Sequence, residues 1–170
     1  NQYLPASVES DAPPSRADLG PAALPWAALA LADKLDTIVG LFAAGERPTG
    51  TRDPMGLRRQ AHGVMKILVD LRELTGLDAA VGLEAMLERA RAEYAEGCGG
   101  GPALPEENQA ERRDRAVFLE ERLRFLFQQR GFGYDEVNAV AGARRSFLDA
   151  PFDARLRLEA LQREIGRAHV

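Results

Sequence analysis

The chain has 170 residues, of which 45% are apolar and 28% are charged, a balance typical of a globular protein rather than a disordered one. Its net charge of −4 gives no support to nucleic-acid binding when the chain is taken as a whole, and no apolar run approaches the roughly 18 residues that span a bilayer. The single cysteine, Cys98, excludes an internal disulfide and favours a reducing compartment, so we expect a cytoplasmic protein with no membrane partner.

The chain opens with a proline-rich lead-in and then a helix. Five of the first 25 residues are proline, which predicts an extended segment without a helix of useful length. The first helix is expected to begin near Trp26, with Pro25 in its first turn, and to end at Gly45. Its apolar face follows helical spacing: Leu31, Leu35, Ile38, Val39 and Phe42.

Two further helices are expected before residue 97. Asp53 followed by Pro54 is typical of a helix N-terminus, because Asp caps the free N–H groups and Pro loses no hydrogen bond at the next position. The helix that follows is expected to end at Gly76. Asp78 is then predicted to cap another helix, which extends to about Glu96.

Residues 97–111 are rich in Gly and Pro and are expected to form a flexible linker. Beyond them we expect a long helix that ends at Gly131, a short helix capped by Asp135, and a last helix that begins near Pro151. Period-2 alternation of β-branched residues is missing from the sequence. The predicted fold is therefore an all-α bundle of about six helices, in two sub-parts joined by a Gly/Pro-rich loop.

Charge divides unevenly at residue 111. Residues 1–111 carry 10 Lys and Arg against 17 Asp and Glu, a net charge of −7, whereas residues 112–170 carry 12 against 9, a net charge of +3. All twelve of the latter cations are Arg, the residue suited to bidentate contacts with phosphate. Such an asymmetry indicates separate roles for the two parts.

An acidic pair lies on the first helix. Asp33 and Asp36 are three residues apart, so both carboxylates project to nearly one side, and Ala30 and Ala32 leave room for another backbone. This arrangement could hold a cation, although it supplies only two ligands. The alternative is a solvated helix face on which Lys34 pairs with the acids.

The turn at residues 45–54 connects the first predicted helix to the second. Four arginines lie on or near it, and arginines beside a helix N-terminus attract phosphate or a partner subunit: Arg47, Arg52, Arg58 and Arg59. In the alternative, the last two pair with acids that precede them in the chain, namely Asp33, Asp36 or Glu46.

Enzyme motifs do not emerge from the sequence. His62 and His169 are the two histidines, and neither lies at metal-ligand spacing from other ligands, so His62 is interpreted as a packed or surface residue. We expect no catalytic site within these 170 residues, and no bound metal or cofactor. The chain begins with Asn1 rather than Met, which indicates a segment of a longer protein.

Two blocks carry a family resemblance. Residues 30–42 read ALADKLDTIVGLF and residues 45–59 read GERPTGTRDPMGLRR, which closely resembles the β subunit of the bacterial two-subunit glycyl-tRNA synthetase. A looser second block resembles the start of that subunit's DALR-type anticodon-binding domain, at Phe118-Leu119, Arg122, Arg124, Gly131, Asp135, Asp149 and Arg155-Leu156.

The resemblance implies a division into domains. Residues 1–96 would be the C-terminal part of an HD-like helical domain, residues 97–111 a linker, and residues 112–170 the N-terminal part of the anticodon-binding domain. Asp33 would occupy the last position of an HD metal motif, vestigial here. The family's α subunit activates glycine with ATP and Mg²⁺ in an α2β2 assembly, so the implied partners are that subunit and tRNA(Gly).

The arginines of the second part are then the candidates for tRNA contacts: Arg122, Arg124, Arg130, Arg144 and Arg145. The alternative role for them is pairing with Asp149 and Asp153. Two other functions remain open at this point. One is an HD-type metal-dependent phosphohydrolase remnant that uses Asp33 and Asp36, and the other is a helical module that only bridges subunits.

Overall fold

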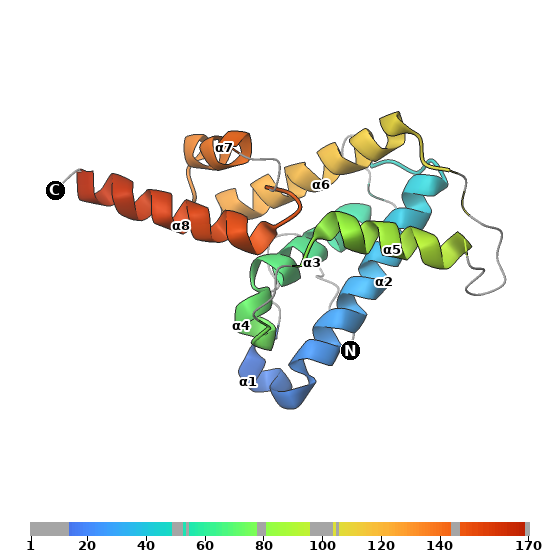
Figure 1. Ribbon diagram of the computed structural model, residues 1–170, viewed down its shortest axis with the longest axis horizontal. Coiled ribbons are helices and arrows are strands. Elements are labelled where there is room, and N and C mark those ends of the chain that lie inside the picture. Colours follow the sequence, from blue (N-terminus) through green and yellow to red (C-terminus); the bar gives the residue numbers. More distant parts are fainter. Residues whose placement is uncertain are drawn as a thin grey trace.

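The computed structural model describes residues 14–48, 53, 55–77, 81–95, 104, 106–143 and 147–168, and these form helices with no strand among them (Figure 1). The prediction of an all-α fold with about six helices is confirmed, since six of the α-helices in these ranges have ten residues or more. The elements are α1 (Arg16–Leu19), the 3₁₀ turn η1 (Gly20–Ala22), α2 (Ala23–Ala43), α3 (Leu57–Val69), α4 (Leu71–Thr75), α5 (Leu83–Ala95), α6 (Gln109–Gln129), α7 (Tyr134–Ala143) and α8 (Pro151–Ala168).

From residue 14 onward the lead-in contains helical turns that its prolines do not predict, while residues 1–13 lie outside the described residues. Ser15 caps the single turn of α1 in a capping box, in which its hydroxyl accepts from the N–H of Asp18 and the Asp18 carboxylate accepts from the N–H of Ser15. Helix α2 begins at Ala23, three residues earlier than expected, and Pro25 lies in its first turn as predicted.

The residue that caps the N-terminus of α3 is not the one that the sequence predicts. The N-cap is Gly56, which adopts a left-handed conformation (φ 67°), rather than Asp53. Asp53 still serves the helix, because its carboxylate accepts the N–H of Arg58 at 3.1 Å from five residues away. The capping chemistry was therefore predicted correctly and its position was wrong by three residues.

The predicted helix from Pro54 to Gly76 is broken at Asp70. This residue has φ −109° and ψ 16°, which separates α3 from α4, and Gly76 (φ 73°) ends α4 as expected. The Asp70 carboxylate accepts hydrogen bonds from Arg130 and Arg155, which come from distant parts of the chain. The break places this carboxylate toward α6 and α8.

Two other helix starts depend on residues that local patterns did not indicate. The N–H of Glu84, in the first turn of α5, donates to the Asp149 carboxylate at 2.9 Å, while the predicted cap Asp78 lies outside the described residues. The N-terminus of α7 is closed by Glu136, which accepts the N–H of Gly133, and not by Asp135. Helices α6 and α8 end and begin close to Gly131 and Pro151, as predicted.

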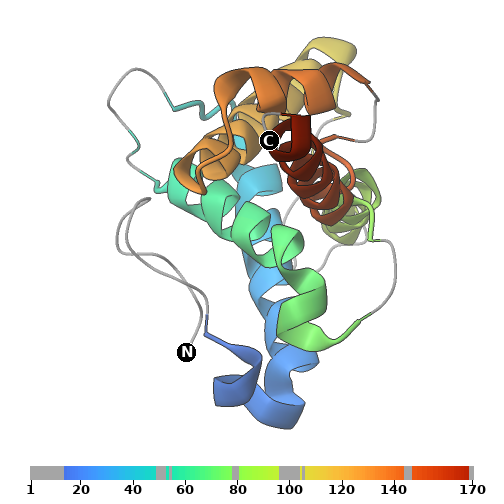
Figure 2. The same cartoon turned by 90° about the vertical axis from the view of Figure 1, so that its left-hand side faces the viewer.

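Helix α3 lies at the centre of the molecule. It packs against α2 on one side and against α6 and α8 on the other, and residues 61–69 are all buried (Figures 1 and 2). Its Leu, Ile, Val and Met side chains each contribute on the order of 1.5–3 kcal/mol by burial.

One hydrophobic core includes residues from both sides of the predicted linker. The rings of Phe42 on α2 and Phe118 on α6, for example, lie 5.5 Å apart. The domain boundaries at 96 and 112 remain predictions, although α6 already begins at Gln109, within the segment expected to be the linker.

Candidate functional site

The acidic pair lies on α2 without further ligands around it. Asp36 is exposed, and its backbone carbonyl accepts the hydroxyl of Tyr94 at 3.3 Å. Asp33 is half-buried, and its carbonyl accepts the hydroxyl of Thr37 at 3.0 Å. Within the described ranges, no group of three or more His, Cys, Asp or Glu side chains is arranged to hold a metal ion.

Lys34, between these two acids in sequence, points into the core. Its side chain is fully buried, and its Nζ has no hydrogen-bond acceptor in the described part of the chain. Burial lowers the pKa of the amine below its ordinary value, against the opposing effect of the Asp33 charge. Of the alternative interpretation, the solvated helix face holds for the exposed Asp36, whereas Lys34 is buried and donates no hydrogen bond to either acid.

The arginines of the turn between α2 and α3 make different contacts and do not form one cluster. Arg47 donates to the carbonyls of Phe42 (2.8 Å) and Glu46 (3.0 Å), and its guanidinium lies 4.2 Å from the centre of the Phe42 ring. It thus caps the C-terminal end of α2. The guanidinium of Arg59 lies against the Cα of Gly56. Arg52 lies outside the described residues.

Two of the predicted RNA-contacting arginines lie on α6 and a third, Arg130, directly follows it, and each has a carboxylate partner. Arg124 pairs with Glu120 at 2.7 Å and donates to the side chain of Asn138 at 2.6 Å. Arg122 lies 3.4 Å from Glu121 and 5.8 Å from the ring centre of Phe118. The side chains of both arginines remain partly exposed.

The third, Arg130, joins the end of α6 to the break after α3. Its guanidinium binds both oxygens of Asp70, at 2.8 and 2.6 Å, in the bidentate geometry that strengthens an ion pair. Arg155 of α8 binds the same carboxylate at 2.8 Å and also pairs with Glu73 of α4. This Asp70 cluster (Asp70, Glu73, Arg130 and Arg155) holds three parts of the chain together.

The remaining two candidates, Arg144 and Arg145, lie outside the described residues. The acids proposed as their alternative partners have other contacts: Asp149 caps α5, and Asp153 pairs with Arg157 on α8. The sequence analysis did not single out Asp70, and it named Arg155 only as part of the second family block, because a lone charged residue carries no signal of a partner 60 or 85 positions away.

A second ionic cluster, also missed, lies at the start of α6. Arg115 is buried and pairs with Glu107 at 2.9 Å and with Glu84 of α5 at 3.6 Å. Burial lowers the pKa of Arg115, and the two carboxylates oppose that shift. A buried Arg in a polar stretch gives no periodic signal, so this position was indistinguishable from its exposed neighbours.

His62 is buried between α3 and α6. Its ring centre lies 5.9 Å from that of Phe125, and neither ring nitrogen has a hydrogen-bond partner in the described part of the chain. Burial, together with the positive charges of Lys66, Arg122 and Arg130, lowers the pKa of His62 to about 4. His62 is therefore neutral at physiological pH, and of the two interpretations, a packed or a surface residue, the first is correct.

Comparison with known proteins agrees with the motif blocks. A family model described as Glycyl-tRNA synthetase beta subunit matches residues 2–142. The glycine–tRNA ligase beta subunit of Acidithiobacillus ferrooxidans (strain ATCC 53993 / BNL-5-31) is 40% identical over 162 residues, which are 95% of this chain and 21% of that protein. The subunit of the same name from Desulforudis audaxviator is 38% identical over 142 residues, 84% of this chain and 18% of that protein.

The chain thus spans about a fifth of the length of the curated relatives that it matches. Among its described helices, none combines the length and the apolar character that crossing a membrane requires.

Proposed function

The chain belongs to the glycyl-tRNA synthetase β-subunit family, and we propose that it serves glycine–tRNA ligase as a non-catalytic helical segment that contacts tRNA(Gly). In this proposal the ATP- and Mg²⁺-dependent glycylation takes place on the α subunit of an α2β2 assembly in the cytoplasm. The helical segment supports that reaction by holding and presenting arginine side chains to the RNA backbone.

The observation that carries the proposal is the placement of three arginines on α6 and directly after it. Arg122, Arg124 and Arg130 have side chains that are 20–30% exposed, each fixed by a carboxylate. A guanidinium has five N–H donors, so one carboxylate partner leaves donors for phosphate. Fixed side chains also lose less conformational entropy on binding than free ones.

The part of the chain that contains α6, α7 and α8 carries the excess of positive charge. Residues 112–170 have a net charge of +3, whereas residues 1–111 have −7. An RNA backbone is attracted to the first and repelled by the second, and this orients the helical segment toward the tRNA. The Asp70 cluster supports the same role, because it keeps the end of α6 in a fixed position on the central helix.

The test is equilibrium binding of tRNA(Gly) to the complete α and β synthetase at several salt concentrations. Arg122→Gln combined with Arg124→Gln should weaken binding and lower the slope of log K against log salt by about 0.7–0.9 for each phosphate that the variant no longer binds. The pair Arg144→Ala and Arg145→Ala should act in the same way.

The matched control is Arg89→Gln on α5, an exposed arginine that also has an i,i+4 carboxylate partner, Glu93. It removes one positive charge from the acidic part of the chain and should leave the salt slope unchanged. Equal slopes and affinities for wild type and both arginine pairs would refute the assignment of tRNA contacts to these residues.

A further inference from the structure

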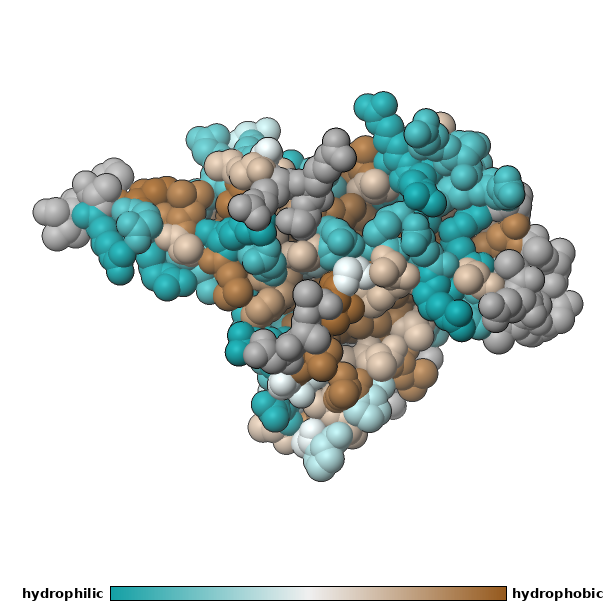
Figure 3. Space-filling model, in the orientation of Figure 1, coloured by the Kyte–Doolittle hydropathy of each residue, from teal (hydrophilic) through white to brown (hydrophobic). Residues whose placement is uncertain are grey.

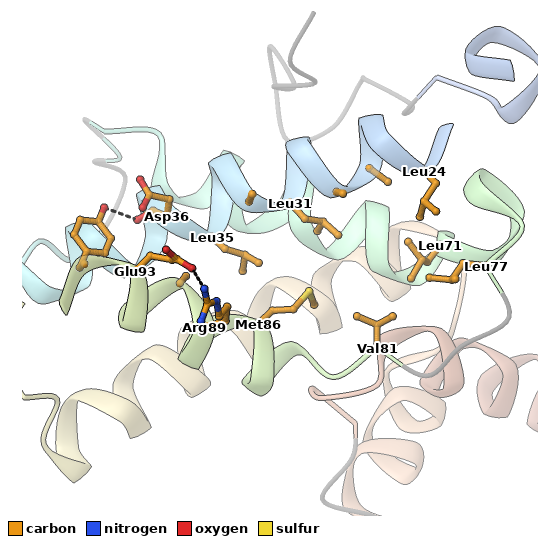
Figure 4. Close-up of a pocket in the computed structure, with 15 residues that line it drawn as sticks. Leu24, Leu31, Leu35, Asp36, Leu71, Leu77, Val81, Met86, Arg89 and Glu93 are labelled. Carbon is orange, nitrogen blue, oxygen red and sulfur yellow. Dashed lines mark hydrogen bonds and ion pairs between the residues drawn. The ribbon is translucent and has the colours of Figure 1, made fainter. Parts of the chain in front are cut away.

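Two hollows on the surface differ in character. The larger is an open groove between α2 and α5, with a volume of about 900 Å³; Figure 3 shows apolar side chains gathered on this face, and Figure 4 shows the groove itself. The smaller, which we call the α6 pocket, lies between the turn that follows α2 and the N-terminal half of α6 and has a volume of about 240 Å³. Unlike the groove, it combines an aromatic floor with arginines and carboxylates.

The floor of the α6 pocket is aromatic, and a guanidinium lies beside it. Phe42 and Phe118 line the pocket with ring centres 5.5 Å apart, and Val117 at its rim is 50% exposed. The guanidinium of Arg47, which also lines the pocket, lies over the Phe42 ring at 4.2 Å from its centre. One face of the guanidinium is thus covered. The other face can stack on a nucleobase, as aromatic rings and arginine planes do in RNA complexes.

Arg47 is already fixed in this position. Its Nη1 donates to the carbonyls of Phe42 and Glu46, at 2.8 and 3.0 Å. Within the described ranges its Nε and Nη2 donate to no acceptor, so these donors remain for a ligand. A side chain that is held before binding loses little conformational entropy when the ligand arrives.

The charges that line the pocket are balanced. Arg47 and Arg113 line it together with two carboxylates of α6, Asp114 and Glu121. A bare anion gains little from such a lining, whereas a ligand with both an anionic group and N–H donors is complementary to it. A nucleotide is such a ligand, because its phosphate accepts from Arg and the exocyclic amino group of A, C or G donates to a carboxylate. The volume is below the roughly 300–1,000 Å³ of pockets for drug-sized ligands, which suits a single base.

Arg113 connects the pocket to the arginines proposed to contact RNA. It is exposed, and within the described ranges it forms no ion pair. Arg113 and Arg124 are 11 residues apart, close to three helical turns, so they lie on the same face of α6 about 16 Å apart along its axis. The guanidinium of Arg122 lies 5.8 Å from the ring centre of Phe118 in the pocket floor. An RNA strand that follows α6 past Arg122 and Arg124 therefore reaches the pocket.

We propose that the α6 pocket binds one unpaired tRNA nucleotide whose base carries an exocyclic amino group. The base stacks on Arg47, its amino group donates to Asp114 or Glu121, and its phosphate accepts from Arg113. Uracil has no such amino group and is disfavoured. The inference rests on the proposed function and deepens it, because it adds recognition of a base to contacts with the RNA backbone.

The experiment is chemical footprinting of tRNA(Gly) bound to saturating amounts of the complete α and β synthetase. Dimethyl sulfate and kethoxal modify the Watson–Crick edges of unpaired A, C and G. The wild-type enzyme should protect one such nucleotide, and that nucleotide should become reactive with Arg47→Lys, which keeps the charge but lacks the plane for stacking. Arg113→Gln should also increase its reactivity. Arg89→Gln on α5, an exposed arginine with an ion pair, is the matched control and should leave the protection unchanged.

Binding isotherms of tRNA(Gly) give a second readout. Arg47→Lys should weaken binding about tenfold at an unchanged salt slope, because stacking is lost and the charge is kept. Arg113→Gln should lower the salt slope by about 0.7–0.9, the value for one phosphate. Arg47 also caps α2, so its variant could weaken binding through the fold, whereas Arg113 is exposed and its variant should fold normally.

Several outcomes overturn the proposal. A wild-type footprint with both Arg47→Lys and Arg113→Gln means that no base occupies the pocket. Wild-type affinity for Arg47→Lys together with weak binding by Arg47→Gln means that the pocket binds phosphate alone. Submillimolar binding of free AMP or CMP that Arg47→Lys abolishes assigns the pocket to a free nucleotide.

Failure of the pocket and failure of the proposed function are distinguishable. If Arg122→Gln with Arg124→Gln weakens tRNA binding while the footprints of Arg47→Lys and Arg113→Gln match that of the wild type, only the pocket is refuted. The proposed function is refuted by its own test, in which the paired arginine variants retain wild-type affinity and salt slope.

Discussion

The two ends of α6 are both anchored by arginine–carboxylate contacts, but in different surroundings. At the N-terminal end, the side chains of Arg115 and Glu107 are 2% and 5% exposed. At the C-terminal end, the side chains of Arg130 and Asp70 are 28% and 20% exposed. The same pair of functional groups therefore has a large desolvation penalty at one end and a small one at the other. Loss of one partner should matter most where the remaining charge cannot reach water.

Replacement of the buried Arg115 tests the N-terminal end of α6 and should have the largest effect on the free energy of unfolding. Arg115→Met leaves Glu107 buried without its nearest cation, so we expect the free energy of unfolding to fall by about 3–5 kcal/mol. Urea denaturation followed by circular dichroism measures this change. The double variant with Glu107→Met removes both charges and should recover most of the loss. A double variant as unstable as the single one would show that packing around Arg115, and not charge, is decisive.

The pH dependence of stability tests the burial of His62 between α3 and α6. The pKa of His62 is about 4 in the folded chain and about 6.5 in the unfolded chain. The unfolded state therefore binds a proton first as the pH falls, and stability that is complete above pH 6.5 is lost progressively toward pH 4. The loss amounts to about 3 kcal/mol.

The variant His62→Phe keeps an aromatic ring against Phe125 and removes the titration. Denaturation curves for both proteins between pH 7 and pH 4 share the contribution of the carboxylates, so their difference isolates His62. Parallel curves for wild type and His62→Phe would contradict the prediction.

A substitution at the more exposed C-terminal end of α6 should lower the stability less, and by an amount that depends on the salt concentration. Asp70→Asn weakens the contacts with Arg130 and Arg155, and we expect a loss of about 1–2 kcal/mol, because these bonds are charge-assisted but partly solvated. High salt should reduce the difference between wild type and Asp70→Asn, since exposed charges are screened, and should leave the Arg115→Met difference nearly unchanged. Equal salt sensitivity of the two variants would remove the distinction between the two ends.

Removal of the N-cap side chain of α6 is expected to have the smallest effect on stability. Asn108 accepts the N–H of Glu111 at 2.9 Å, and Glu111 accepts the N–H of Asn108 at 3.1 Å. Asn108→Ala should therefore lower stability by about 1 kcal/mol, measured in the same urea series. Asn108→Ser keeps a capping oxygen and should be nearly neutral. Equal losses for Ala and Ser would mean that the capping box is not the source of the effect.

Local sequence patterns were sufficient to predict the long helices. The apolar spacing of residues 31–42, the stop at Gly131 and the start near Pro151 each depend on neighbours within a few positions, and the structure confirms them. The break at Asp70 could not be predicted in this way, because its partners Arg130 and Arg155 are 60 and 85 residues away.

Prediction of the candidate site had a similar limit. Residue type alone identified arginines that could bind phosphate, and Arg122 and Arg124 are partly exposed. Burial, however, depends on how distant helices pack. A sequence therefore does not reveal that Lys34 and Arg115 are buried whereas Arg124 is not. The groove between α2 and α5 was not foreseen for the same reason, since its two walls come from separate helices.

The cap of α5 has a consequence for the order of folding during synthesis. The N–H groups of Leu83 and Glu84 are satisfied by the carbonyl and the carboxylate of Asp149, which leaves the ribosome 65 residues after Glu84. A nascent chain that ends before Asp149 exposes the first turn of α5 to water and lacks the segment that leads into α8. The start of α5 and the docking of α8 should therefore become protected from hydrogen exchange in a single late step, after α2 and α3 have paired.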